Sequence, residues 1–135
     1  MTTTDDTTQL LLDFGRVWDA DSPPELVDQV FAPEVLDHDP QPEQRQGREG
    51  FRQLLDLYHR VFPDLRLTVD DVLVYEDQAV LRWHATGTHE GDQLGIPATH
   101  REVRFTGIDM VRVEAGRVVE RWGHSNELQV QQQLS

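Results

Sequence analysis

Up to Phe62, hydrophobic residues recur at the spacing of an α-helix in three separate stretches. This pattern predicts three helices, with buried faces formed by Leu10, Leu11, Phe14, Val17 and Trp18, then by Leu26, Val27, Val30 and Phe31, and then by Phe51, Leu54, Leu55, Tyr58, Val61 and Phe62. Pro33 ends the second helix and Pro63 the third, because proline cannot continue helical hydrogen bonding. Residues 35–40 form a short extended segment between these two helices.

Beyond Pro63 the hydrophobic pattern alternates, as it does in strands that bury one face. The alternation shifts its phase at Asp70-Asp71, which predicts a β-bulge. Further strands are predicted over residues 79–89, 102–113 and 117–124, the last two joined as a hairpin by a turn at Gly116. The polar tail, residues 125–135, fits either a short helix or irregular chain.

Three helices followed by antiparallel strands predict one α+β domain over residues 1–135, with the helices packed on one curved, mostly antiparallel sheet. A sheet wrapped around helices leaves a cone, and its open mouth is where a small-molecule pocket is expected. The helices cannot cover the outer face of the sheet, which carries Ile108 and Met110. We therefore expect a homodimer or a homotetramer.

Charge and composition narrow the possible partners. The net charge of −13 argues against nucleic acid and anionic membranes, which both bind clustered Lys and Arg, and favours a ligand that is neutral or is held locally by arginine. The chain has no cysteine, which excludes disulfides and thiolate chemistry. The N-terminus has no signal-peptide pattern and no stretch is apolar enough to span a membrane, so we expect a cytoplasmic protein.

The hairpin contains the best candidate site. Asp109 shares its side-chain parity with apolar residues of the same strand, and a carboxylate in such a row is costly unless it is paired or functional. In the second strand, Trp122 and His124 share one parity, and Asn126 follows the strand. If the two rows lie on one face, an acid, an imidazole, an indole and an amide meet at one end of the sheet.

Asp109 has two interpretations: a general base with a raised pKa, or the partner of Arg82 in a buried ion pair, which we favour. His124 is then the better acid/base candidate, because imidazole exchanges protons near neutral pH. Pairing about the turn places Asp109 near residue 121 and His124 roughly 10 Å farther along, so the two are expected to act independently. Tyr58, Trp83 and Trp122 are candidate pocket walls or hydrogen-bond donors for a flat substrate.

Histidines elsewhere give weaker signals. His84, His89 and His100, with Asp92, lack the short spacings of a zinc site, so no metal is expected. His38 precedes the turn signal Asp39-Pro40 and either caps that loop or faces the pocket.

A series of short motifs runs in order along most of the chain: Val35-Leu36-Asp37-His38-Asp39-Pro40, Gly47-Arg48-Glu49-Gly50-Phe51, Phe62-Pro63-Asp64-Leu65, Thr86-Gly87-Thr88-His89-Glu90-Gly91, Leu94-Gly95-Ile96-Pro97, Phe105-Thr106-Gly107-Ile108-Asp109, Arg112, Gly116-Arg117, Glu120-Arg121-Trp122 and Gln133-Leu134. In these motifs the chain resembles the SnoaL-like polyketide cyclase family. The resemblance implies the cone-shaped α+β barrel shared with ketosteroid isomerase and scytalone dehydratase. It also implies aldol ring closure without metal or cofactor, as in antibiotic biosynthesis, and places His38 at the pocket.

This chain departs from the family pattern at its C-terminal end. Asn126 stands where the family usually has an aspartate, Gly123 where an acidic residue is common, and His100 adds an imidazole near the mouth. We therefore expect a cofactor-free cyclase acting on a small hydrophobic or aromatic polyketide-like substrate, with His124, Asp109 and Asn126 as catalytic candidates and His38, Tyr58, Trp83, His100 and Trp122 as substrate-binding candidates. The alternatives are a family-type hydroxylase that works with a separate reductase and a non-catalytic binding module.

Overall fold

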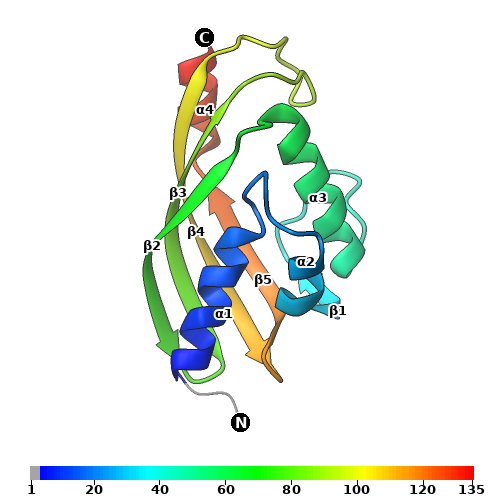
Figure 1. Ribbon diagram of the computed structural model, residues 1–135, viewed down its shortest axis with the longest axis vertical. Helices are drawn as coiled ribbons and strands as arrows, with labels where there is room; N and C mark the ends of the chain where they lie inside the picture. Colours follow the sequence, from blue (N-terminus) through cyan, green and yellow to red (C-terminus); the bar gives the residue numbers. More distant parts are fainter. Residues whose placement is uncertain (1–3) are drawn as a thin grey trace.

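Residues 4–135, which the computed structural model describes, form four helices and one five-stranded sheet (Figure 1). The first three residues of the polar N-terminus lie outside this range. The elements are α1 (Thr4–Arg16), α2 (Glu25–Val30), β1 (Phe31–Asp37), α3 (Arg48–Val61), β2 (Arg66–Tyr75), β3 (Gln78–Thr88), β4 (Glu102–Glu114), β5 (Arg117–Ser125) and α4 (Glu127–Leu134). No helix among them is long and apolar enough to cross a membrane.

The sheet has the strand order β1-β5-β4-β3-β2, and only β1 runs parallel to its neighbour. The predicted α+β class and the mostly antiparallel sheet are thus confirmed. The register of β2 against β3 shifts between Val69 and Asp71, which confirms the bulge expected there. A second shift, between Arg112 and Val113 of β4, decides which side chains of β5 face the core.

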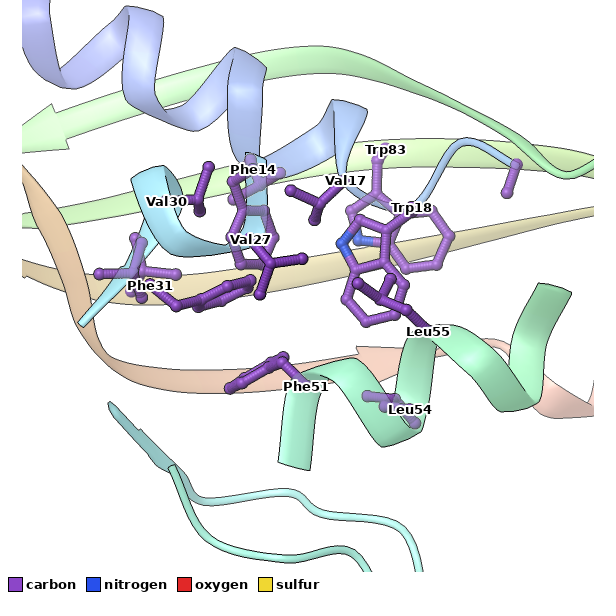
Figure 2. Close-up of a cluster of buried hydrophobic side chains, with 14 of the residues drawn as sticks. Phe14, Val17, Trp18, Val27, Val30, Phe31, Phe51, Leu54, Leu55 and Trp83 are labelled. Atoms are coloured by element: carbon purple, nitrogen blue, oxygen red, sulfur yellow. The ribbon is translucent and has the colours of Figure 1, made fainter. Parts of the chain in front are cut away.

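Helices α1, α2 and α3 lie on one face of the curved sheet, and their apolar stripes fill the space against it (Figures 1 and 2). Phe31 differs from the expectation, because α2 ends at Val30 and Phe31 is extended and begins β1. Its ring stacks on Phe51 of α3 at a centroid distance of 4.1 Å. The core therefore joins the edge strand to a helix through aromatic contact, which positions the loop that follows β1.

The glutamine-rich tail of the chain forms helix α4, and its side chains bind the backbone of β4. Gln133 accepts a hydrogen bond from the backbone N–H of Arg104 (2.8 Å) and donates one to its carbonyl oxygen (2.7 Å). Gln129 accepts one from the N–H of Thr106 (3.1 Å). This part of β4 lies beyond its pairing with β5, so the amide side chains replace a missing neighbouring strand.

The other face of the sheet carries exposed apolar side chains. Ile108 is 55% exposed, Leu73 72% and Tyr75 75%. Ile108 therefore points outward, as the strand pattern predicted, and Met110 on the same row is half-buried.

Candidate active site

A cavity of about 460 Å³ lies between the helices and the concave face of the sheet. Its apolar walls come from several elements and include Trp18, Leu54, Leu67, Trp83 and Phe105. Its polar lining includes Asp39, Tyr58, Asp109, Arg121 and Glu127. A pocket with apolar walls and a few convergent polar groups is the usual form of a small-molecule site.

Asp109 reaches this cavity from the middle of β4, where alternation places its side chain on the buried face. The residue is 1% exposed. Trp83 Nε1 donates a hydrogen bond to Asp109 Oδ1 (3.2 Å), and Arg121 Nε donates one to Oδ2 (3.0 Å). The expected pairing with Arg82 is wrong: Arg82 lies opposite Ile108 on the outer face and pairs with the exposed Asp71.

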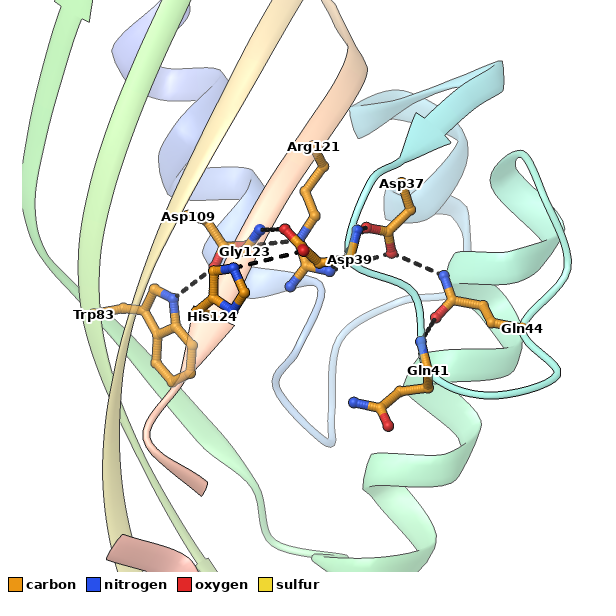
Figure 3. Close-up of polar contacts among 9 residues, drawn as sticks. All are labelled: Asp37, Asp39, Gln41, Gln44, Trp83, Asp109, Arg121, Gly123 and His124. Carbon is orange, nitrogen blue, oxygen red and sulfur yellow. Dashed lines mark hydrogen bonds and ion pairs between the residues drawn. The ribbon is translucent and has the colours of Figure 1, made fainter. Parts of the chain in front are cut away.

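Arg121 is also buried and joins Asp109 to a second carboxylate (Figure 3). Its Nη1 lies 3.1 Å and 3.2 Å from the two oxygens of Asp37, at the end of β1. Asp37 also accepts hydrogen bonds from the backbone N–H of Asp39 (3.0 Å) and from Gln44 Nε2 (2.9 Å). The result is a buried row of carboxylate, guanidinium and carboxylate that the sequence interpretation missed.

The bulge explains why Arg121 faces the cavity. Arg112 pairs with Glu120 but Val113 pairs with Val118, so one extra residue in β5 reverses the expected parity. Arg121 and Gly123 are buried, whereas Trp122 is half-buried and His124 is exposed. The expected shared face of Asp109, Trp122 and His124 is therefore wrong.

Gly123, rather than residue 121, lies directly opposite Asp109. A Cβ atom at this position would lie 2.4 Å from Arg121 Nη2 and 2.5 Å from its Nε. The absence of a side chain at Gly123 thus makes room for the guanidinium beside Asp109. The family that the sequence resembles often has an acidic side chain at position 123. This chain has glycine there, and the guanidinium of Arg121 occupies the space.

His124 and His38 lie outside the buried cluster. The side chain of His124 is 85% exposed at the rim of the cavity, with Nε2 3.5 Å from Asp39 Oδ1. His38 stacks on Trp122 at 4.4 Å with nearly parallel rings and lies 3.0 Å from Glu120 Oε2. Neither His38 nor Trp122 is among the residues that line the cavity.

The other candidates divide between the cavity and the surface. Trp83 and Tyr58 line the cavity. His100 pairs with Glu90 on an exposed loop (2.8 Å). Asn126 accepts a hydrogen bond from the N–H of Gln129 (3.1 Å) and thereby caps α4. Among residues 4–135, no group of three or more His, Asp or Glu side chains is arranged to hold a metal ion.

Burial controls the proton chemistry of the cavity. It raises the pKa of Asp109, and the positive charge of Arg121 and the hydrogen bond from Trp83 only partly oppose this. Burial also raises the pKa of Tyr58, with the negative charge of Glu127 adding to it. The phenol of Tyr58 can therefore donate a hydrogen bond, and the carboxylate form of Asp109 accepts a proton more readily than an exposed carboxylate does. A proton acceptor beside hydrogen-bond donors is the arrangement that forms and stabilises an enolate.

Comparison with known proteins identifies the family and the fold. The model of a family described as SnoaL-like polyketide cyclase matches residues 8–134. TsrD from Streptomyces laurentii is 30% identical, with 100% of this chain and 98% of that chain covered and a TM-score of 0.89. IdmH from Streptomyces antibioticus is 28% identical, with 94% and 96% covered and a TM-score of 0.81. A SnoaL-like polyketide cyclase from Agrobacterium tumefaciens, at 19% identity, 100% coverage of both chains and a TM-score of 0.75, shares the fold. No curated protein matches the chain.

Proposed function

The chain belongs to the SnoaL-like polyketide cyclase family, and we propose that it closes a ring of a small aromatic polyketide by intramolecular aldol chemistry without a cofactor. The observation that carries this proposal is the Asp109 carboxyl group, which is buried at the cavity with a raised pKa. A base of this kind abstracts a proton next to a carbonyl group more effectively than an exposed carboxylate, because its proton affinity is closer to the working pH.

In the proposed reaction, Asp109 removes a proton from the carbon next to one carbonyl group. The resulting enolate attacks a second carbonyl carbon, which forms the new carbon–carbon bond and leaves an alkoxide. Protonated Asp109 then returns its proton to that alkoxide, so the product is an isomer of the substrate. The hydroxyl group of Tyr58 and Nη2 of Arg121, which lies over Gly123, are donors available for the enolate oxygen.

The charges around the cavity favour a neutral substrate. Asp39 and Glu127 line it together with Asp109, and the guanidinium of Arg121 is already bound to two carboxylates. Among the described residues that line the cavity, Arg121 is paired with Asp109 and Asp37 and His124 with Asp39, so an anionic ligand would meet an excess of negative charge. Flat aromatic rings suit the walls formed by Trp18, Trp83 and Phe105.

A direct test uses the purified protein with a neutral aromatic β-diketone ester and, separately, with the corresponding free acid. We expect cyclisation of the ester to a product of the same mass, or of that mass less one water, without oxygen consumption. The free acid should be a poorer substrate. Oxygen uptake with the mass of one oxygen added to the product would support the hydroxylase instead. Tight binding of several such ligands without turnover would support a binding module.

A further inference from the structure

We propose that Asp37 is a positioning residue that sets the proton affinity of Asp109 through Arg121. This inference rests on the proposed function, because it concerns the residue that we assign as the base. Asp37 belongs to β1, at the edge of the sheet, and Asp109 belongs to β4, with β5 between them. Arg121 of β5 is the group that contacts both carboxylates (Figure 3).

The contacts of the two carboxylates are unequal. Both oxygens of Asp37 lie within 3.2 Å of Arg121 Nη1, and each accepts one further hydrogen bond, from the N–H of Asp39 or from Gln44. Asp109 accepts only one bond from Arg121, through Nε, and one from Trp83. Hydrogen bonds to a carboxylate stabilise its ionised form. Negative charge is therefore better accommodated on Asp37 than on Asp109.

The charges of the cluster do not cancel. With both carboxylates ionised, one guanidinium faces two negative charges in a buried site. The remaining titratable groups that line the cavity, among the described residues, are Tyr58, Asp39, Glu127 and His124. Of these, only His124 can carry a positive charge, and its side chain is 85% exposed at the rim and faces Asp39. An excess negative charge in low dielectric favours uptake of a proton.

Asp37 thus prevents Arg121 from acting as a full counter-ion of Asp109. If Asp109 alone neutralised Arg121, the pair would be a simple ion pair and Asp109 would be a weak base. Asp37 does this without touching the substrate, because it does not line the cavity. A residue with this role should affect the pH dependence and kcat while leaving KM unchanged.

The test measures the titration of the Asp109 carboxyl group by NMR with ¹³C-labelled aspartate in the intact protein. In Asp37→Asn, the midpoint for Asp109 should fall by roughly one unit, because Arg121 then serves Asp109 alone. The acid limb of the pH–kcat profile should move to lower pH by the same amount. Asp37→Glu, which keeps the charge, should restore most of the wild-type midpoint. The matched control is Asp71→Asn, which removes the partner of the exposed Arg82 and should leave the titration of Asp109 unchanged.

Each outcome decides the proposal. An unchanged Asp109 titration in Asp37→Asn, with only a lower Tm, would make Asp37 a structural support and overturn the inference. If Asp37→Asn does not fold, the wild-type titration decides. Coupling between the two carboxylates should give the Asp109 resonance two inflections, and a single step would overturn the inference. Because the NMR measurement needs no substrate, a shifted Asp109 titration without any cyclisation would refute the proposed function alone.

Discussion

Asp109→Asn tests most directly whether the buried carboxyl group works in catalysis or in stability. The substitution removes the charge and keeps the size of the side chain. Arg121 does not become a lone buried charge, because Asp37 still holds its Nη1. The asparagine oxygen can accept from Arg121 or from Trp83, so one of the two hydrogen bonds to Asp109 is lost.

The raised pKa of Asp109 determines the effect on stability. Because the folded protein binds this proton more tightly than the unfolded chain does, Asp109 favours folding most below the pKa of an unfolded aspartate, about 4. That contribution is lost as the pH rises through the pKa of Asp109 in the folded protein. It amounts to about 1.4 kcal/mol for each unit by which the folded pKa exceeds the unfolded pKa. The variant avoids this loss but forgoes one hydrogen bond, worth about 1 kcal/mol. At neutral pH the variant should therefore lose no more than about 1 kcal/mol of unfolding free energy relative to wild type, far less than the roughly 3–5 kcal/mol lost when a buried charge loses its partner.

Denaturant unfolding of Asp109→Asn and wild type at several pH values between 4 and 8 measures this effect. The free energy of unfolding of the wild type, relative to the variant, should decrease as the pH rises. Turnover in the variant should fall by roughly 10²-fold or more. Asp71→Asn, at an exposed ion pair, is the matched control and should change neither quantity appreciably. A loss of several kcal/mol at pH 7 would mean that Arg121 depends on Asp109, and unchanged turnover would exclude Asp109 as the base.

The remaining predictions concern the surroundings of Asp109 and the outer face. His124→Ala should change turnover little and leave Tm unchanged, since the side chain is exposed at the rim; a loss comparable to that of Asp109→Asn would return the acid/base role to His124. Tyr58→Phe should lower kcat by roughly 10²-fold with Tm retained, and an equal rise in KM instead would show a role in binding alone. Gly123→Ala should destabilise the fold by about 1–3 kcal/mol and lower kcat, because its Cβ would displace the guanidinium of Arg121; wild-type thermal melting and turnover would contradict this. Light scattering at micromolar concentration should give the mass of a dimer or a tetramer, formed through the outer face around Ile108, and a monomer mass would contradict it.

The periodicity of the sequence was sufficient for the fold class and for one member of the site. Helical and alternating spacing are local properties, so they located the helices and most strands directly. The same alternation placed Asp109 on the buried face of its strand, where an acidic residue stands out among valines. The phase change at Asp70-Asp71 likewise disclosed a real bulge, because it interrupts an apolar row that is visible in the sequence.

What the sequence alone could not decide was which groups surround Asp109. The bulge in β5 falls at Val119 and leaves no interruption in a short and largely polar strand, so the expected inward face was the wrong one. Arg121 and Asp37 are 84 residues apart and meet only because β1 adds in parallel to the edge of the hairpin. Local pattern can identify a costly carboxylate in an apolar row. The identity of its partner depends on strand order and register, which long-range packing determines.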